Sequence, residues 1–253
     1  MRPIPKGALF FSALLYKHLQ TTRPGRIIRE STSAGTPAMQ PQYFDQTQLD
    51  LAIDNLVEKG WHVWPDAIDS QLCLTLLHEI DQLDQQGEMQ QAGIGRGQEH
   101  QLNQRIRRDS IHWLERTSPA QAQYLDLMQQ LQLELNRQLF LGLFEYEAHF
   151  ALYSPGDFYK KHWDSFRGAA NRMVTTVSYL NPDWLDSWGG ELVIYDEQDT
   201  HIIGQVTPEI GTLVLFMSEQ VPHEVKPTQQ PRASIAGWFR LNTSIAGQLN
   251  PPS

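Results

Sequence analysis

RMVTTVSYLNPDWLDSWGGELVIY, residues 172–195, carries the pattern that decides the fold. Apolar and β-branched residues fill its two ends, at 173–179 and 191–195, and the turn-forming pairs Asn181-Pro182 and Gly189-Gly190 lie between them. Short runs of this composition, bounded by turn residues, are typical of β-strands. The stretch therefore predicts two strands joined by a loop.

The same texture continues on both sides of this stretch. Further short alternating or apolar runs, again bounded by turn residues, lie at 146–153, 201–206, 212–216 and 232–240. Many short strands in succession favour a β-sandwich or a jelly roll. We find no internal repeat, and we expect the strands to pack in one domain with the helices that precede them.

The first half of the chain shows helical spacing of its apolar residues instead. Three helices are predicted, at 47–58, 69–86 and 118–139. Alternating residues at 61–64 and 105–114 predict two more strands, and the polar, glycine-bearing segment 87–104 predicts a long loop of the functional or disordered kind. Helices followed by strands indicate the α+β class.

These patterns predict one domain over residues 43–243, with helical support at 43–145 and a jelly-roll core at 146–243. Residues 21–42 are rich in Ser, Thr, Gly and Pro, so we expect 1–42 to be a poorly ordered leader or linker. Residues 244–253 are expected to form a short tail.

The leader leaves three interpretations open. Its apolar run at 8–16, preceded by Arg2 and Lys6, faintly resembles a secretory signal. The absence of acidic residues up to Arg29 also resembles an organelle presequence, and Met39 offers a later start. We expect an ordinary cytoplasmic protein.

Composition limits the classes of function. The net charge of −9 argues against a nucleic-acid partner, because phosphate contacts need a basic surface. No apolar run is long enough to span a bilayer, so no membrane association is expected. Cys73 is the single cysteine, which excludes an intrachain disulfide, and its leucine-rich surroundings predict a buried helical residue. We expect a monomer in a reducing compartment.

His162, Asp164 and His223 are candidate metal ligands. On a strand, positions two residues apart point to the same face, so His162 and Asp164 can reach one ion, and a distant strand of a closed barrel can supply His223. Two imidazoles and one carboxylate form the facial triad of non-haem Fe(II) oxygenases. A hydrogen-bonded core histidine and a zinc hydrolase site are the alternatives.

Arg232 lies in an otherwise apolar strand, where an unpaired charge would be costly. A guanidinium binds a carboxylate through two parallel hydrogen bonds. Arg232 is therefore expected to hold an anion, either a dicarboxylate cosubstrate or an Asp or Glu of the chain itself.

Four segments in order resemble the prolyl 4-hydroxylase branch of the 2-oxoglutarate- and Fe(II)-dependent dioxygenases, with the closest likeness to oxygen-sensing prolyl hydroxylases and their bacterial relatives. They are YSPGDFYKKHWD (153–164), RMVTTVSYLN (172–181), WGGELVIY (188–195) and VPHEVKPTQQPRASIAGWF (221–239). RRDSIHW (107–113) also matches, and the resemblance extends over about 45–242. It implies a double-stranded β-helix core.

The resemblance also implies roles for single residues. His162, Asp164 and His223 would bind Fe(II), and Arg232 and Tyr179 would hold the distal carboxylate of 2-oxoglutarate. Tyr153 and Thr175 would lie beside the cosubstrate, with ordinary core packing as the alternative for the tyrosines.

Asp109, Arg172 and Trp238 would border the substrate, and the first two would pair with each other. A plain surface salt bridge is an equal explanation of that pair, and core packing is an alternative role for Trp238.

The implied activity is that of a peptidyl-proline 4-dioxygenase. Fe(II), 2-oxoglutarate, O₂ and ascorbate as reductant would convert a prolyl residue in a protein through a ferryl intermediate, with release of succinate and CO₂. Some bacterial relatives act on elongation factor Tu, so a translation factor is a candidate substrate. Hydroxylation of a free amino acid or small molecule, and a non-enzymatic metal-binding jelly roll, remain as alternatives.

Overall fold

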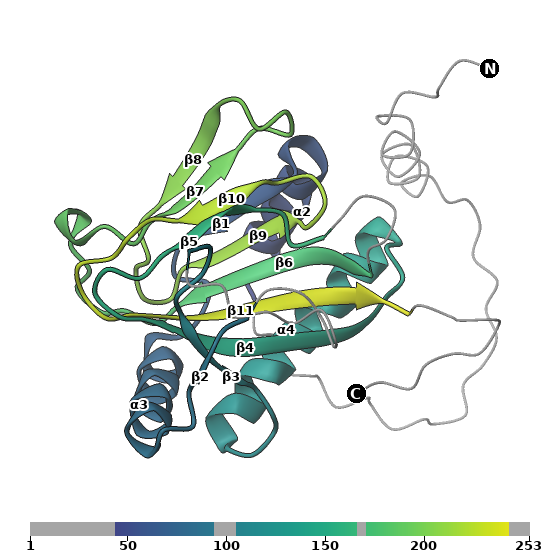
Figure 1. Cartoon of the computed structure of the whole chain (residues 1–253). Helices are drawn as coiled ribbons and strands as arrows, with labels where there is room; N and C mark the ends of the chain where they lie inside the picture. Colours follow the sequence, from purple (N-terminus) through teal and green to yellow (C-terminus); the bar gives the residue numbers. More distant parts are fainter. Residues whose placement is uncertain (1–43, 94–104, 166–170, 243–253) are drawn as a thin grey trace, which may run out of the picture.

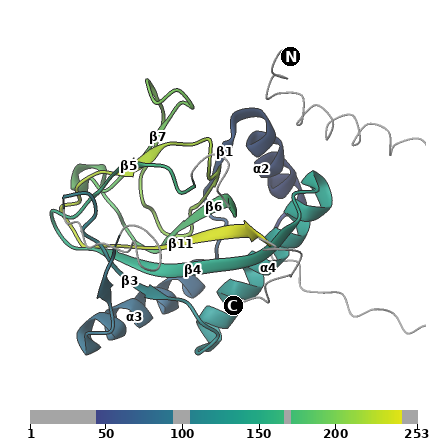
Figure 2. The same cartoon turned by 45° about the vertical axis from the view of Figure 1, so that its right-hand side comes forward.

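The computed structural model describes residues 44–93, 105–165 and 171–242. Two antiparallel sheets face each other, and the long helices lie outside the larger sheet (Figures 1 and 2). This arrangement is the predicted α+β architecture with a jelly-roll core. The expected leader over 1–42 and the tail over 244–253 lie outside the described residues, as does most of the predicted loop at 87–104.

All three predicted helices form, with bounds within two residues of those expected. They are α2 (Gln46–Lys59), α3 (Ser70–Gln86) and α4 (Pro119–Leu139). Each begins after a side chain that accepts a hydrogen bond from a backbone N–H of the first turn, namely Asp45, Asp69 and Ser118. The first residues of these helices could be predicted because the capping side chains can be recognised in the sequence.

The larger sheet has the strand order β1-β9-β6-β11-β4-β3-β2. Its strands are β1 (Trp61–Trp64), β2 (Gln90–Gln91), β3 (Ser110–Trp113), β4 (Leu143–Tyr153), β6 (Arg172–Tyr179), β9 (Leu213–Met217) and β11 (Arg232–Leu241). The smaller sheet has the order β5-β10-β7-β8, with β5 (Tyr159–His162), β7 (Leu192–Tyr195), β8 (Ile202–Val206) and β10 (His223–Val225). A short 3₁₀ helix, η2 (Asp186–Trp188), precedes β7.

Strand alternation separates the two faces of the larger sheet. On β11, Ile235 and Phe239 point outward into the apolar cluster that α2, α3 and α4 cover. On β6 and β4, Tyr179 and Tyr153 point inward, into a second cluster between the two sheets. Because successive strand residues face opposite sides, the outer face supplies the core under the helices and the inner face is left for a site.

Two local predictions need correction. The strand expected at 105–114 is restricted to β3, because residues 105–109 turn back toward β5, where Arg108 N–H donates to the Phe158 carbonyl. No apolar run marks the strand β5, since Lys160 and Lys161 interrupt any alternation, and only the spacing of His162 and Asp164 suggested a strand at this place. Within the predicted loop, Gln90 and Gln91 pair with β3.

Two further expectations concern Cys73 and membrane association. Cys73 is buried on α3, and burial raises the pKa of its thiol to about 11, so it is a core residue as predicted.

Among the described residues, no helix combines the length and the apolar character needed to cross a bilayer.

His149 is a buried histidine on the inner face of β4. Its ring packs against Trp113 and Trp238, with ring centroids 5.2 and 5.4 Å away, and its Nδ1 donates to the Phe150 carbonyl at 3.0 Å. Burial, assisted by the charge of Arg107, lowers the pKa of His149 to about 4. The imidazole is therefore neutral in the folded protein at neutral pH.

The packing of α4 predicts a contrast between two leucines of that helix. Leu131 is fully buried, whereas Leu133 is 56% exposed. We expect Leu131→Ala to lower the free energy of unfolding by about 2–5 kcal/mol, because it leaves a cavity. Leu133→Ala should change it by less than about 0.5 kcal/mol. Urea unfolding measures both, and equal losses would contradict the packing of α4 described above.

The lowered pKa of His149 predicts a pH-dependent stability. The unfolded chain binds a proton at this histidine below about pH 6.5, while the folded chain binds it only below about pH 4. Stability is therefore lost as pH falls through this window, and His149 accounts for about 2 kcal/mol between pH 7 and pH 5. His149→Gln should remove that share in urea unfolding of chelator-treated protein. A variant with the wild-type pH dependence would refute the assignment.

Candidate metal centre

The three predicted metal ligands meet at one point between the sheets. His162 ends β5, His223 begins β10, and the two are paired residues of the smaller sheet. Asp164 lies in the bend after β5, with its carboxylate oxygens 3.5 Å from His162 Nε2 and 3.8 Å from His223 Nε2. One possible ligand atom from each residue lies within 4.8 Å of the others. The cluster forms, although Asp164 reaches it from a bend and not from the strand that we expected.

Hydrogen bonds to the backbone orient both imidazoles. His162 Nδ1 lies 2.8 Å from the Lys160 carbonyl, and His223 Nδ1 lies 3.1 Å from the Val221 carbonyl. Because a carbonyl only accepts, each Nδ1 carries the proton and each Nε2 offers a lone pair. This second hydrogen bond is the usual way in which proteins fix a metal-binding histidine.

The charges of the cluster also suit a cation. Burial opposes ionisation of Asp164, but the nearby imidazoles, His223 foremost, outweigh it and hold the pKa of its carboxyl well below the usual range. Burial lowers the pKa of His223 to about 4, so its ring is neutral at physiological pH. Two neutral imidazole nitrogens and one carboxylate are the donor set that binds Fe(II) in non-haem oxygenases.

Thr175, which is expected beside the cosubstrate, also contacts one of the candidate metal ligands. Its hydroxyl donates to Asp164 at 2.8 Å and lies 2.8 Å from the hydroxyl of Ser218. Both hydroxyls are almost fully buried. Thr175 and Ser218 thus hold the carboxylate of Asp164 in place, and no sequence pattern pointed to Ser218.

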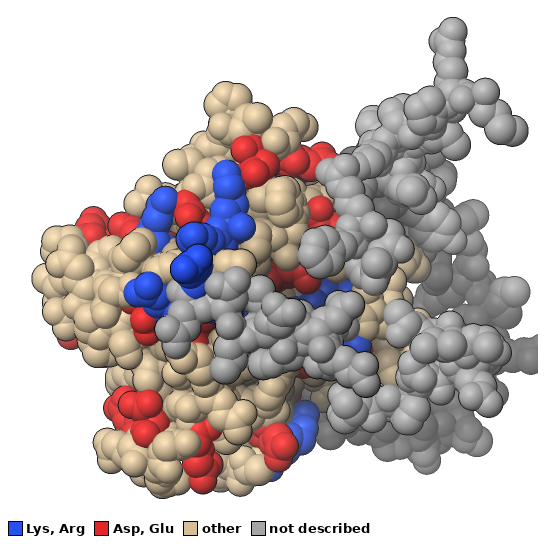
Figure 3. Space-filling view, in the orientation of Figure 1, with Lys and Arg blue, Asp and Glu red and all other residues tan. Residues whose placement is uncertain are grey.

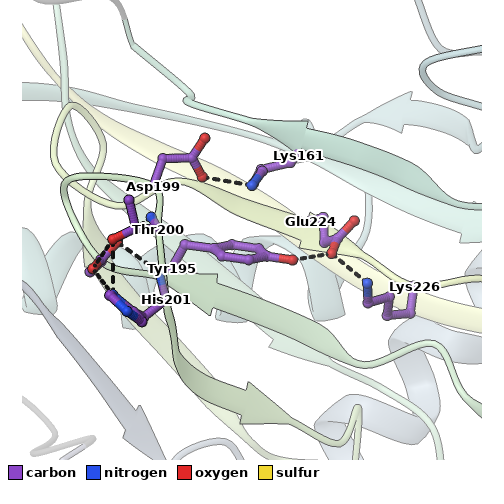
Figure 4. Close-up of polar contacts among 8 residues, drawn as sticks. Lys161, Tyr195, Asp199, Thr200, His201, Glu224 and Lys226 are labelled. Atoms are coloured by element: carbon purple, nitrogen blue, oxygen red, sulfur yellow. Dashed lines mark hydrogen bonds and ion pairs between the residues drawn. The ribbon is translucent and has the colours of Figure 1, made fainter.

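A network on the opposite face of the smaller sheet secures the two histidine strands (Figure 4). Lys161 and Glu224, the neighbours of His162 and His223, point away from the metal cluster. Lys161 pairs with Asp199 at 2.8 Å and lies over the ring of Tyr195, and the Tyr195 hydroxyl and Lys226 both donate to Glu224. These contacts connect β5, β7 and β10, so they fix the inward direction of the histidines.

The basic side chains on this side of the molecule are grouped. Figure 3 shows Lys and Arg gathered mainly over β5 and β10, while Asp and Glu are spread over the rest of the visible surface. The grouping is small and local.

Arg232 lies on the inner face at the start of β11 and is 1% exposed. Its Nε donates to the Gly190 carbonyl at 2.8 Å and its Nη1 to Ser234 at 3.2 Å, whereas Nη2 has no partner. Within the described residues no carboxylate lies at salt-bridge distance from Arg232, which argues against an internal acid as its counter-ion. A buried cation of this kind is expected to bind an anionic ligand.

Two tyrosines line the same place. The guanidinium carbon of Arg232 lies 4.9 Å from the ring centroid of Tyr153 and 5.1 Å from that of Tyr179. The Tyr179 hydroxyl is buried and lacks a hydrogen-bond partner, and burial raises its pKa to about 12 although Arg232 acts in the opposite direction. Buried polar atoms without partners are rare in proteins, so the unpaired groups of Tyr179 and Arg232 fit the two oxygens of a bound carboxylate.

A glycine is required at position 190 for a second reason, besides the turn that the sequence suggested. A Cβ on this residue would lie 3.1 Å from Arg232 Cδ and 3.2 Å from the Thr228 side chain, and its φ is +73°. A side chain here would push Arg232 out of place. The sequence signal, a Gly-Gly pair before a strand, was visible, but its link to Arg232 was not.

The implied pair of Asp109 and Arg172 does not form. Asp109 is fully buried and both its oxygens accept from Arg107, at 2.6 and 2.7 Å. Arg172 pairs instead with Glu147 at 2.7 Å and stacks on Trp238, which is 6% exposed. The pair does not form because the register of the sheet brings Glu147 of β4 beside Arg172. The carboxylate of Asp109 already accepts two hydrogen bonds from Arg107.

One aromatic contact was missed altogether. Tyr159 stacks on His162, with centroids 3.6 Å apart and planes 14° from parallel. The pairing of β5 with β10 shifts between His162 and Tyr159. A shift of this kind leaves no periodic pattern of residues, so the stack could not be predicted from the sequence.

Comparison with known proteins places this geometry in a family. The model of the 2OG-Fe(II) oxygenase superfamily matches residues 148–240. Egl nine homolog 1 of Rattus norvegicus is 32% identical over 143 residues, which is 53% of this chain and 41% of that protein. The chain thus spans about two fifths of this relative, and 33% of its human counterpart.

Two solved structures are similar over most of the chain. A Pseudomonas putida prolyl-4-hydroxylase is 39% identical, with a TM-score of 0.70, covering 76% of this chain and 99% of that one. A Trichoplax adhaerens prolyl hydroxylase, in complex with a peptide fragment of the hypoxia inducible factor oxygen degradation domain, is 26% identical, with a TM-score of 0.68 over 77% of this chain and 91% of that one. The chain belongs to the 2OG-Fe(II) oxygenase superfamily, a family that implies Fe(II), 2-oxoglutarate and O₂.

Proposed function

We propose that this chain hydroxylates a prolyl residue of a protein, using 2-oxoglutarate and O₂ and releasing succinate and CO₂. The observation that carries the proposal is the pair of unpartnered buried groups, Arg232 Nη2 and the Tyr179 hydroxyl, which lie on the inner face of the larger sheet, the face turned toward the smaller sheet that carries His162 and His223. Relatives named prolyl hydroxylases support the prolyl substrate.

Each residue of the site has a separate task in this proposal. His162, Asp164 and His223 would hold the iron. Arg232 and Tyr179 would bind the distal carboxylate of 2-oxoglutarate and so turn its keto acid end toward the metal. When bound, the iron supplies the activation of O₂ that breaks a C–H bond.

Tyr153 connects the two halves of the site. It faces Arg232, and its pKa is raised above the usual range by burial, with further effects from the charges of Asp109, Arg107 and Arg232. Tyr159, which also affects that pKa, stacks on His162. Tyr153 and Tyr159 would exclude water between the cosubstrate and the metal.

The remaining parts of the proposal follow from this chemistry. Ascorbate would keep the iron ferrous, and a reducing, cytoplasmic location would suit both ferrous iron and the free thiol of Cys73. Residues 43–243 would act as one dioxygenase domain, because the larger sheet packs against the three long helices on one face and against the smaller sheet on the other. The protein substrate that we propose is a translation factor, and the alternative class of substrate is a free amino acid or small molecule.

The activity can be tested with purified protein, Fe(II), ascorbate and 2-oxoglutarate labelled at C1. We expect labelled CO₂ and, after incubation with a dialysed cell extract, protein prolines heavier by one oxygen atom. His162→Ala and Asp164→Ala should each lower CO₂ release by about 100-fold or more, because the ligand set is incomplete. His201→Ala, which removes an exposed histidine outside the cluster, should not. Ligand variants as active as wild type would exclude this metal site.

The role of Arg232 can be tested by binding alone. Arg232→Gln should raise the Kd for 2-oxoglutarate by about 10–100-fold, because a charge-assisted hydrogen bond is lost, and should leave the affinity for the metal unchanged. Arg240→Gln is the matched control, since it removes an arginine from the same strand that pairs with Glu145 and Glu147. If both variants bind 2-oxoglutarate like wild type, Arg232 is not the cosubstrate anchor.

A further inference from the structure

Three neighbouring strands carry an ion-pair and aromatic cluster beside the metal site. Glu147 lies on β4, Trp238 on β11 and Arg172 on β6, and these strands are adjacent in the larger sheet. Glu147 and Trp238 are direct cross-strand partners. Their side chains therefore lie next to each other on the inner face of the sheet.

The carboxylate of Glu147 fixes the direction of the Arg172 side chain. Its Oε1 accepts from Arg172 Nε at 2.9 Å and from Nη2 at 2.7 Å, which prevents rotation of the guanidinium. Held in this way, the guanidinium carbon lies 3.6 Å from the ring centroid of Trp238. A cation at this distance over an indole attracts the ring face, so Arg172 and Trp238 hold each other in place.

This stack forms a wall next to the metal cluster. Trp238 is the cross-strand partner of Thr175, whose hydroxyl donates to Asp164. On the side away from the metal, the ring of Trp238 contacts His149 and lies 6.5 Å from Trp113, which is 47% exposed. The aromatic surface thus runs from beside the cluster to the outside of the protein.

We propose that Glu147 is a positioning residue for the substrate. It acts through Arg172 to fix Trp238 as one side of the path to the metal. The inference rests on the proposed function, and it assigns to a strand of the barrel the part that the resemblance gave to Asp109. Within residues 44–93, 105–165 and 171–242, the hydrogen bonds and ion pairs of Glu147 are with Arg172 and Arg240 and not with His162, Asp164, His223, Arg232 or Tyr179, so we assign it a positioning role and not a catalytic one.

A matched control lies two residues away on the same strand. Glu145 also pairs with Arg240, at 2.8 Å, as Glu147 does, but within the described part of the chain Arg172 pairs with Glu147 and not with Glu145. Glu145→Gln and Glu147→Gln remove the same charge from the same network. A role in stability alone would give the two variants the same behaviour, whereas substrate positioning would separate them.

The kinetic test uses a library of short synthetic peptides, each with one central proline. We expect Glu147→Gln to lower kcat/KM for peptide hydroxylation by about fivefold or more, the effect of losing a partly buried cation–π contact. It should also release more CO₂ per hydroxyproline formed, while the KM for 2-oxoglutarate stays as in wild type. Glu145→Gln should match wild type in all three quantities.

Arg172→Lys gives a second arm, because lysine keeps the charge and loses the two-pronged contact. The double variant Glu147→Gln/Arg172→Lys should fall no further than either single variant, since both act on one contact. Additive losses would contradict the inference.

The spectroscopic test needs no substrate. The indole ring shifts the NMR signals of the Arg172 side-chain protons, and Glu147→Gln should move them toward the positions of an unstacked arginine. Glu145→Gln should leave them in place.

The outcomes separate the two proposals. An active wild type, together with a Glu147→Gln variant that matches Glu145→Gln in coupling, kcat/KM and the Arg172 signals, overturns the positioning role alone. A wild type that consumes no 2-oxoglutarate and hydroxylates no peptide overturns the proposed function, and the positioning role falls with it.

Discussion

The buried guanidinium of Arg232 is the constraint on which the rest of the interior depends. A cation that is 1% exposed is costly unless its surroundings compensate for lost water. The chain provides the Gly190 carbonyl, the Ser234 hydroxyl and two tyrosine rings, and leaves one nitrogen without a partner. This incomplete compensation is the reason why we propose that the interior binds an anion at Arg232.

The larger sheet meets this constraint by dividing its two faces. The outward residues of β4, β6, β9 and β11 form an apolar cluster under the helices, and this cluster supplies stability. The inward residues are then free to include Arg232, Thr175 and Trp238, whose polar atoms would be unfavourable in a purely apolar core. The helices cover the outer face of the sheet, opposite the metal cluster.

Local patterns predicted most of the fold. Helix bounds followed from capping residues such as Asp69 and Ser118, and the strands of the second half followed from alternation. The bounds of β5 were not predicted, because the two lysines at its centre interrupt the alternation of apolar residues. Asp164 was expected on a strand, because its spacing from His162 does not by itself reveal a bend. The meeting of His162, Asp164 and His223 could be expected because two histidines and a carboxylate are the residue types that a metal site requires.

The pairing at the substrate side was not predictable in the same way. The choice of Arg172 between Asp109 and Glu147 as its ion-pair partner depends on two contacts. One is the register of β4 against β11, and the other is the ion pair in which Arg107 already engages Asp109. Neither is encoded in a local run of residues. Tyr159 and Ser218 reach the metal cluster through tertiary contacts of the same kind.

A single strand carries both Arg232 and Trp238, six residues apart on the same face. At about 3.3 Å per residue, β11 sets a distance of about 20 Å between Arg232, where we propose that an anion binds, and the indole of Trp238. Its pairing with β4 shows no irregularity between these two positions. One inserted residue between them would turn Trp238 toward the helices and leave Arg232 where it is. The length of this strand is therefore as much a part of the site as any side chain, and natural variation in the family should avoid insertions here while tolerating them in the loops.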